Sequence, residues 1–378
     1  MRKSTYTFMR NYRATKRRKK MKLTVAPMMK VTNYNFRRFF AEVFQNEIER
    51  DELSLYTEML NVNFLLRGKR DDVEEALKCT PNSTILQVGG NCENTFRDVG
   101  RMLRERNTKF QGLNINAGCP SPRVSGDGCF GAALMRYPER LGRLGAILSE
   151  TSGMSVSVKH RIGVVDRIDE MNDSITFENL ANFVDTVHRS SQGTVRHFDV
   201  HSRCAVLNFN PKKNREIPPI RYDYVYDLIR EFPNLHFSLN GEVCARSVPS
   251  HITDGNVREF MIGRAVQNHG PKTLDDIFHP NEYRLDHYCK AARRYLSSSD
   301  LRCNSRQQAL APLSNLFNGE KGARRYRRSL NESSDLHPLD IFNRALEEGG
   351  IEIDRDRQST DENRENLNED RQSSMVMS

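Results

Sequence analysis

Eight short β-rich segments recur along the chain, and this series constrains the fold more than any other feature of the sequence. Each segment ends in glycine, proline, asparagine or a charged cluster, which are typical of turns at strand ends. The segments are residues 23–27, 53–59, 84–90, 112–120, 154–163, 197–203, 235–241 and 258–264.

Helical patterns fill the intervals between these segments. Apolar residues recur at three- and four-residue spacing in 93–107, 175–189 and 222–232. Repeated strand–helix alternation of this length predicts an α/β fold of the (β/α)8 TIM-barrel type. A doubly wound sheet is the rival fold, but it usually has fewer strands and a glycine-rich first turn. The first segment ends in Ala26-Pro27-Met28 and has no GxGxxG, so we favour the barrel.

The sequence predicts four parts along the chain. Residues 1–21 form a basic arm that we expect to be disordered, and residues 22–284 form the barrel. Residues 285–350 are helical in pattern and form a small C-terminal helical domain. Residues 351–378 are rich in Asp, Glu, Asn, Arg and Ser and lack apolar periodicity, so we expect a disordered tail.

Composition excludes several classes of protein. No apolar run approaches the roughly 18–20 residues that a membrane span requires, and no apolar stretch near the start resembles a secretory signal. The formal charge of +9 is uneven, because residues 1–22 carry ten Lys or Arg and no acid. The eight cysteines form no CxxC pair and no cluster with zinc-ligand spacing. We therefore expect reduced thiols, no metal and no membrane partner.

Residues at the ends of the strands are the candidate site, because barrel enzymes bind substrates at the C-terminal ends of their strands. Cations, amides, a histidine and one thiol gather there with hardly any carboxylate. This argues against a metal site or a two-carboxylate hydrolase. The residues are Pro27, Met28, Glu58, Gln87, Asn116, Cys119, Lys159, Arg161, His201, Arg203, Asn240, Gly241, Gly263 and Arg264.

The last two strands indicate a phosphate site. They end in Asn240-Gly241 and Gly263-Arg264, and glycines let backbone N–H groups reach an anion while an arginine adds a bidentate cation. The same glycines could simply make turns, Lys159 could be a surface cation, and His201 could be a packed histidine. Because Lys159 and His201 face the same mouth, we favour a negatively polarised cofactor ring.

Cys119 lies in the glycine- and proline-rich segment 116–135. A free cysteine is usually a small buried hydrophobe, but one on a loop over an active-site mouth can donate a proton, with an unperturbed pKa of about 8.5. Cys129 lies ten residues further on. The residues alone do not decide between the two thiols.

Nine motifs together resemble the tRNA-dihydrouridine synthases, and most closely the A-type group that modifies positions 20 and 20a of the D-loop. The resemblance covers roughly residues 22–330. The motifs are APMMKVTNYNFRRFF, LYTEM, LQVGG, LNINAGCPSPRVSGDGCFGAALM, VSVKHRIGVVD, NPKKNREIPPIRYDYVYDL, SLNGE, MIGRAVQN and PLSNLFNGEKGARRYRR.

This resemblance implies an FMN-dependent oxidoreductase with NADPH as reductant and tRNA as partner. It implies reduction of uridine to 5,6-dihydrouridine, with hydride passing from reduced FMN to C6 and a proton from Cys119 to C5. It implies cofactor contacts from Pro27, Met28, Met29, Gln87, Lys159, His201, Asn240, Gly241, Glu242, Gly263 and Arg264. It implies tRNA contacts from Asn116, Lys212, Arg215 and a basic segment containing Arg324, Arg325, Arg327 and Arg328. We expect a monomer.

The sequence departs from the family pattern in several places. HSRC at 201–204 stands where the family usually has HARK, and Val206 stands where tryptophan is frequent. Glu242 replaces the second glycine of NGG, and its carboxylate should weaken FMN binding unless the side chain points away. Pro249 and Gly255 make a regular helix after the seventh strand doubtful.

Two other functions remain open from the sequence. One is a tRNA-binding scaffold protein that has lost tight flavin binding, which Glu242 and the altered segment after it suggest. The other is a flavoenzyme acting on a small pyrimidine, which the basic segment argues against. We expect a cytoplasmic location. The KRRKK arm could instead be a nuclear signal, an RNA-binding arm, part of a mitochondrial transit segment or a solvated tail.

Overall fold

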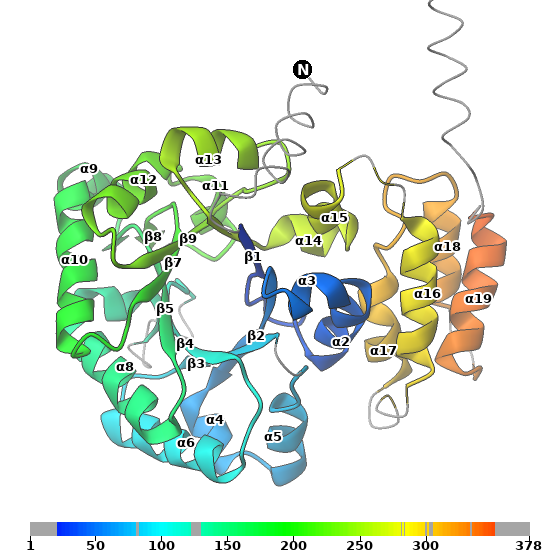
Figure 1. Ribbon diagram of the computed structural model, residues 1–378, viewed down its shortest axis with the longest axis horizontal. Coiled ribbons are helices and arrows are strands. Elements are labelled where there is room, and N and C mark those ends of the chain that lie inside the picture. Colours follow the sequence, from blue (N-terminus) through cyan, green and yellow to red (C-terminus); the bar gives the residue numbers. More distant parts are fainter. Residues whose placement is uncertain are drawn as a thin grey trace, which may run out of the picture.

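Eight parallel strands close into a barrel, as the sequence predicts (Figure 1). The computed structural model describes residues 21–80, 83–121, 130–280, 282, 284–298, 301, 305–332 and 335–351. The strand order around the barrel is β1-β10-β9-β7-β5-β4-β3-β2. The strands are β1 (Lys22–Val25), β2 (Leu53–Asn61), β3 (Thr84–Gly89), β4 (Gly112–Ala117), β5 (Val156–Arg161), β7 (His197–His201), β9 (His236–Asn240) and β10 (Glu259–Ile262).

Helices surround the barrel and extend beyond it at the C-terminal end of the chain. Those before and around the barrel are α2 (Tyr34–Val43), α3 (Gln45–Glu49), α4 (Val62–Arg67), α5 (Arg70–Ala76), α6 (Glu93–Glu105), η1 (Gly131–Arg136), α8 (Pro138–Ser152), η2 (Ile168–Glu170), α9 (Met171–Ser174), α10 (Phe177–Ser190), α11 (Lys213–Glu216), α12 (Tyr222–Glu231), α13 (Val248–Gly255), α14 (Arg264–His269) and α15 (Lys272–Phe278). The last ones are α16 (Leu285–Leu296), α17 (Arg306–Leu310), η4 (Ala311–Leu313), α18 (Ala323–Leu330) and α19 (Pro338–Gly349).

All eight expected strand segments overlap a barrel strand, and the three expected barrel helices correspond to α6, α10 and α12. The expected disordered arm, 1–21, and tail, 351–378, lie outside the described residues except for Met21 and Ile351. A small parallel sheet of β6 (Val164–Val165) and β8 (Ala205–Val206) was not expected, because two-residue strands carry no periodicity to detect.

The doubt about a helix after the seventh strand is wrong. Residues Val248–Gly255 form α13. Pro249 lies in its first turn, where a missing N–H breaks no helical hydrogen bond. Asn256 then ends the helix in the left-handed conformation, with a φ of 50°. The proline and glycine therefore mark the two ends of the helix.

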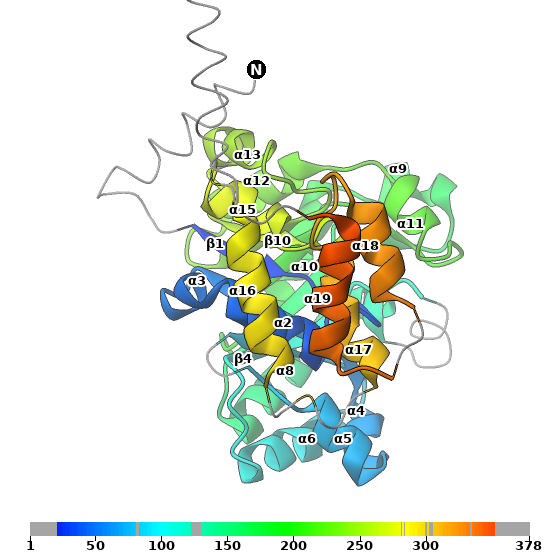
Figure 2. The ribbon, with the colours of Figure 1, turned by 90° about the vertical axis from the view of Figure 1, so that its right-hand side faces the viewer.

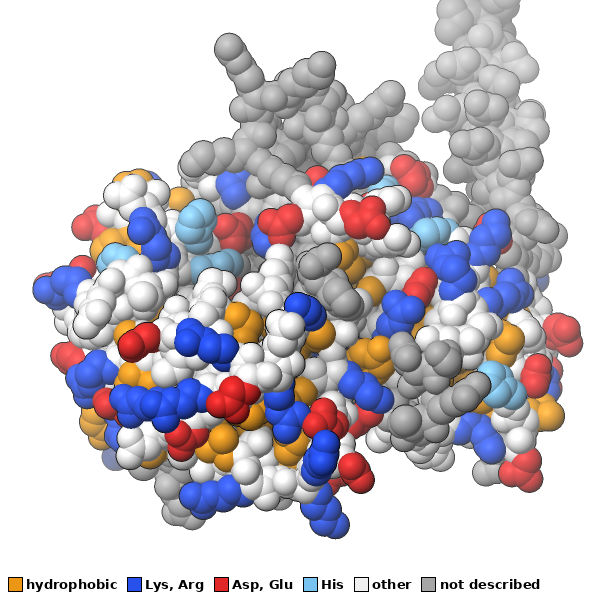
Figure 3. Space-filling view, turned by 60° about the horizontal axis from the view of Figure 1, so that its bottom comes forward, with side chains coloured by type: hydrophobic (Ala, Val, Ile, Leu, Met, Phe, Trp, Pro, Cys, Tyr) orange, Lys and Arg blue, Asp and Glu red, His pale blue; other side chains and the backbone are white. Residues whose placement is uncertain are grey.

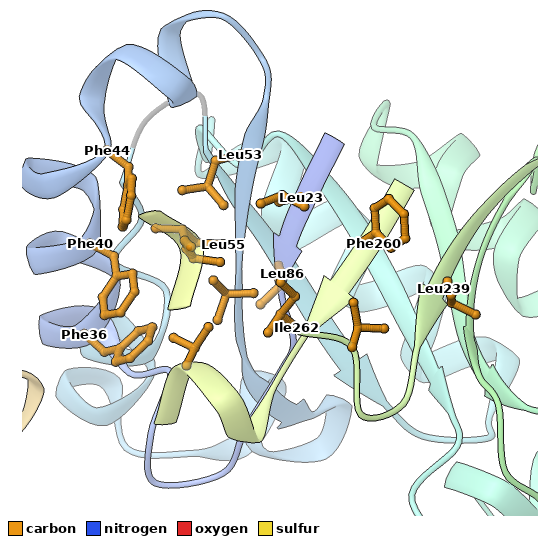
Figure 4. Close-up of a cluster of buried hydrophobic side chains, with 14 of the residues drawn as sticks. Leu23, Phe36, Phe40, Phe44, Leu53, Leu55, Leu86, Leu239, Phe260 and Ile262 are labelled. Atoms are coloured by element: carbon orange, nitrogen blue, oxygen red, sulfur yellow. The ribbon is translucent and has the colours of Figure 1, made fainter. Parts of the chain in front are cut away.

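The hydrophobic core lies between the strands and the surrounding helices. Figure 4 shows Phe36 and Phe40 of α2, and Phe44 directly after it, directed toward apolar side chains of the strands. Phe36 and Phe40 stack with ring centroids 4.2 Å apart. Because every second residue of a strand faces the helices, the remaining residues line the inside of the barrel.

Polar side chains make up most of the inside of the barrel, beside the apolar Ile85 and Met261. Bulky branched residues usually fill this space in TIM barrels. Here the strand register places polar side chains on the inner face, and several are fully buried. They are Thr24, Ser54, Tyr56, Gln87, Asn114, Ser157, Lys159, Asp199, Ser238 and Asn240.

The C-terminal helices pack beside α2. Figure 2 shows α16, α18 and α19 side by side at one edge of the barrel. Tyr295 of α16 contacts Phe39 of α2, with ring centroids 5.8 Å apart. A Cβ on Gly322, which has a φ of 88°, would lie 1.9 Å from the carbonyl oxygen of Gly349. Glycine is therefore required where the start of α18 meets the end of α19.

His160 makes the fold sensitive to acid. It faces the helices from β5, with its ring 5.0 Å from that of Phe183. Its Nδ1–H donates to the carbonyl oxygen of Arg161 at 2.7 Å, and its buried Nε2 has no partner among the described residues. Burial lowers the pKa of His160 from 6.5 to about 4.

This shift predicts that stability falls as the pH drops below 6.5. The unfolded chain takes up a proton at His160 before the folded chain does, so stability is fully present above pH 6.5 and is lost toward pH 4. Between pH 7 and pH 5 we expect a loss of about 2 kcal/mol from this residue. Denaturant unfolding at both pH values measures it. His160→Gln should reduce the difference, and identical pH dependence in both proteins would contradict the prediction.

Candidate active site

A cavity of about 820 Å³ opens at the C-terminal ends of the barrel strands. It brings together residues from β3, β4, β5, β7 and β9 with those of the loops that follow β1 and β10. Fifteen residues expected at the site from the sequence line it: Pro27, Met28, Met29, Gln87, Asn116, Cys119, Lys159, Arg161, His201, Arg215, Asn240, Gly241, Glu242, Gly263 and Arg264.

Lys159 provides a partly buried cation on the inner face of β5. Its Nζ donates to Oδ1 of Asn240 at 3.1 Å, while Nδ2 of Asn240 donates to the carbonyl oxygen of Met261 at 2.8 Å. Burial lowers the pKa of Lys159 to about 8, and the nearby carboxylate of Asp199 opposes that shift. The ammonium group is thus held in place and is only weakly protonated above pH 8.

His201 lies among cations at the end of β7. Burial lowers its pKa well below 6.5, and Arg161, Lys159, Arg203 and Arg264 lower it further. The imidazole is therefore neutral at pH 7. It can donate one hydrogen bond and accept another at the mouth of the barrel.

Asn116 organises the backbone that carries Cys119. Its Oδ1 accepts from the backbone N–H groups of Gly118 and Cys119 at 3.2 and 3.0 Å, and its Nδ2 donates to Oε1 of Gln87 at 2.9 Å. Cys119 is half-buried and lines the cavity. The rival thiol, Cys129, lies outside the described residues.

Arg161 anchors two loops at the mouth. Its Nε donates to the carbonyl oxygen of Gly118 at 2.9 Å. Its Nη1 donates to the carbonyl oxygens of Cys204 and Asn214 at 2.9 and 3.1 Å. Arg161 therefore connects the Cys119 loop with the segment that carries Arg215. The sequence placed Arg161 at a strand end but did not indicate this bridging role.

Glu242 forms ion pairs with cations at the end of the cavity where the sequence predicts the phosphate. Its Oε1 lies 2.6 Å from Nη2 of Arg203 and 3.6 Å from Nη2 of Arg264. Its φ of 51° is left-handed, as is the φ of 123° at Gly241. The side chain lines the cavity and does not point away from it. The hydroxyl of Tyr222 donates to the carbonyl oxygen of Gly241 at 2.7 Å and supports the turn.

Lys212 and Arg215 lie in the same loop but in different surroundings. Arg215 is half-buried on the cavity, whereas Lys212 is exposed beside it. Buried Asn214 holds the loop, because its Nδ2 donates to the carbonyl oxygens of Val206 and Phe209 at 2.8 and 3.0 Å. The segment thus places Arg215 on the cavity and Lys212 on the surface.

The basic segment lies on α18, outside the cavity, but is connected to its rim. Nη1 of Arg327 donates to Oδ1 of Asn318 at 3.3 Å, and Nδ2 of Asn318 donates to the carbonyl oxygen of Asn268 at 3.0 Å. Asn268 lines the cavity. Arg324, Arg325 and Arg328 are exposed, and Arg327 is half-buried.

Two carboxylates are placed differently from what the sequence predicts. Glu58 does not line the cavity. Its Oε1 accepts from the backbone N–H of Lys30, next to a register shift in β2 between Tyr56 and Met59. Asp199, which the sequence reasoning did not single out, is fully buried inside the barrel. An acid two residues before His201, and so on the same face of the strand, is the signal that could have found it.

The described residues hold no cluster of three or more His, Cys, Asp or Glu side chains placed to bind a metal ion. Among the helices in the described ranges, no helix is both long and apolar enough to cross a bilayer. Over the face seen in Figure 3, Lys and Arg side chains are spread out with Asp and Glu between them.

A closed parallel barrel with a cationic mouth and a thiol on the rim defines a (β/α)8-barrel enzyme. The chain belongs to the family described as dihydrouridine synthase (Dus), whose profile matches residues 24–348. Membership in this family makes the protein an oxidoreductase.

Curated relatives match over most of the chain. The tRNA-dihydrouridine(20/20a) synthase of Synechocystis sp. is 33% identical over 324 residues, covering 83% of this chain and 90% of that protein. The protein of the same name from Escherichia coli (strain K12) is 31% identical over 327 residues, covering 85% and 88%. A solved structure of morphinone reductase in complex with tetrahydroNAD is 10% identical, covers 68% and 86% of the two chains and gives a TM-score of 0.39, too low to bear on function.

Proposed function

We propose that the protein reduces uridine to 5,6-dihydrouridine at positions 20 and 20a of the tRNA D-loop. The observation that carries this proposal is one cavity on which Cys119 and Asn116 lie together with Lys159 and His201. Relatives named tRNA-dihydrouridine(20/20a) synthase, alignable over 83–86% of the chain, support the substrate and its positions. We also propose that the protein acts as a monomer.

The donor set of the cavity suits FMN, apart from Glu242. An isoalloxazine ring has a planar edge of carbonyl and N–H groups, which Gln87 can meet with an amide. Lys159 and neutral His201 can face the polar atoms of the ring. Pro27, Met28 and Met29 give apolar contact at the same cavity. Gly241, Gly263 and Arg264 suit the phosphate, although the Arg264 guanidinium lies 3.6 Å from the Glu242 carboxylate.

Reduced FMN, regenerated by NADPH, would supply the hydride to C6 of the uracil ring. The negative charge that then develops at C5 and O4 needs a proton, which Cys119, a residue that lines the cavity, would deliver. Lys159 and Arg161 lie within electrostatic range of Cys119. The charge left on sulfur after transfer therefore faces two cations. The Asn116–backbone bonds hold the loop in position for this step.

Cations outside the cavity can bind parts of the tRNA other than the reacting base. The base must leave its stack to enter the barrel, which costs a few kcal/mol. Exposed Arg324 and Arg328 on α18, together with Lys212 near the mouth, can bind phosphates and repay that cost. Binding should therefore weaken as salt rises.

A test of the function uses the purified protein, reduced anaerobically by NADPH and mixed with tRNA that lacks dihydrouridine. We expect flavin absorbance that is bleached by NADPH and restored by tRNA, but not by free uridine. The Arg324→Ala/Arg328→Ala variant should need more tRNA for the same reoxidation while NADPH still reduces it normally. Colourless protein that binds tRNA would favour the scaffold function, and reoxidation by a free pyrimidine would favour a small-molecule substrate.

A further inference from the structure

Helix α14 lies between the barrel strands and the C-terminal helices and forms part of the cavity wall (Figure 1). It begins at Arg264, at the end of the cavity where the sequence predicts the phosphate, and ends at His269. Its last three residues, Gln267, Asn268 and His269, are exposed and also line the cavity. Because an α-helix rises about 1.5 Å per residue, α14 carries this wall about 8 Å away from Arg264. His269 was not among the residues that the sequence placed at the site.

Two asparagines of the segment before α18 cap the end of α14. The last carbonyl groups of an α-helix have no N–H partner within the helix. Nδ2 of Asn315 donates to the carbonyl oxygen of Gln267 at 2.8 Å, and Nδ2 of Asn318 donates to that of Asn268 at 3.0 Å. The two segments approach closely, since a Cβ on Gly270 would lie 3.0 Å from the carbonyl oxygen of Asn315. The C-terminal part of the chain therefore holds the end of α14.

The same contact determines the tautomer of His269. Oδ1 of Asn318 accepts from Nη1 of Arg327 at 3.3 Å, and a guanidinium group can only donate. Nδ2 of Asn318 is therefore the donor to the carbonyl oxygen of Asn268 and to Nδ1 of His269, at 3.0 and 2.9 Å. A ring nitrogen that accepts a hydrogen bond carries no hydrogen, so the neutral imidazole has its hydrogen on Nε2. Within the described part of the chain, the imidazole makes this hydrogen bond alone.

His269 therefore offers one N–H donor on an exposed ring that lines the cavity. Its surroundings favour an anionic acceptor, because Arg264 lies on the same helix and Arg327 lies on the other side of Asn318. The carboxylate of Glu242, which also lines the cavity, pairs with Arg203 at 2.6 Å. A tRNA that binds both in the cavity and on α18 must cross α14, and its phosphates provide acceptor oxygens whatever the base.

We propose that His269 is a tRNA-binding residue whose Nε2–H donates to a phosphate oxygen between the reacting uridine and the phosphates that α18 binds. Asn318 is the residue that positions it. The inference rests on the proposed function and adds to it a contact between the cavity and the basic segment. Since the donor is neutral, it strengthens binding without adding a cation.

The test measures dissociation constants of the FMN-loaded protein for tRNA that lacks dihydrouridine. His269→Ala should weaken binding about fivefold, because one hydrogen bond to a phosphate is lost, while NADPH reduces the flavin at the wild-type rate. His269→Gln should keep most of the affinity, since its amide can donate with a similar reach. The slope of log affinity against log salt should be unchanged in His269→Ala, because a neutral donor displaces no counterion. Arg324→Ala/Arg328→Ala should flatten that slope.

The positioning role of Asn318 has its own control. Asn318→Leu should weaken tRNA binding about as much as His269→Ala, and combining the two substitutions should cost little more. Asn315→Leu removes the other cap from the same helix end but not a contact with His269, so it should bind tRNA nearly as the wild type does. Equal losses in the two asparagine variants would overturn the positioning role, because a general loosening of α14 would then explain both.

Synthetic tRNAs that carry a single methylphosphonate linkage in the D-loop locate the phosphate. One linkage should weaken binding to the wild type about fivefold and have no further effect on His269→Ala. Wild-type affinity in His269→Ala, or a loss that appears in the KM for NADPH and not in tRNA binding, would overturn the proposal. Reoxidation of the wild-type flavin by tRNA is measured separately, so failure of this contact is distinguishable from failure of the proposed function.

Discussion

Replacing Cys119 by alanine is expected to lower the rate of dihydrouridine formation by about 10²–10⁴-fold, the usual contribution of a positioned general acid. Alanine leaves the hydride without a matching proton at C5. The loop should keep its shape, because the Asn116 oxygen binds the backbone N–H of residue 119 and not its side chain. Binding of FMN and tRNA should therefore change little.

The measurement combines dihydrouridine in digested tRNA with the rate at which tRNA reoxidises the NADPH-reduced flavin. Cys244→Ala is the matched control, since Cys244 is also a half-buried thiol on the cavity wall but lies after β9. It should keep nearly full activity. Full activity in Cys119→Ala would make the proton-donor assignment wrong, and Cys129 would be the next thiol to replace.

The barrel was predictable from the sequence because its signals are local. Each strand combines a β-rich segment with a turn residue, and the site residues follow from the rule that strand ends meet at one mouth. Lys159, His201 and Asn240 reach one cavity for this reason. Their neighbours in space come from strands that are far apart in the sequence but paired in the barrel sheet. Lys159, for example, lies beside Asp199 of the paired strand.

The parts that could not be predicted depend on contacts between distant residues. Asp199 accepts a hydrogen bond from Asn114, which is 85 positions away in the chain, and no spacing rule connects them. The partner of Glu242 could not be predicted either, because Arg203 is 39 residues away and was identified only as a residue at the end of a strand. The prediction at Pro249 was wrong because proline disrupts a helix only in its interior, and the sequence did not show that this helix begins at the preceding residue.

Removing the charge of Glu242 is expected to tighten FMN binding by about tenfold. The carboxylate holds Arg203 at 2.6 Å and approaches Arg264 at 3.6 Å, so a phosphate must share these cations with a fixed negative charge. The side chain is 49% exposed, and solvent screening keeps the effect moderate. Glutamine retains the shape and the left-handed backbone strain, which glycine would relieve. Glu242→Gln therefore isolates the charge.

Riboflavin, which lacks the phosphate, shows whether the effect acts at the phosphate end. Dissociation constants from flavin fluorescence should fall for FMN in Glu242→Gln and stay constant for riboflavin. Arg264→Met should raise the dissociation constant for FMN and leave that for riboflavin unchanged. The control Glu216→Gln, at an exposed position, should change neither dissociation constant. If Glu242→Gln instead weakens FMN, or shifts both ligands equally, the carboxylate serves to orient Arg203 and Arg264 for the phosphate and does not compete with it.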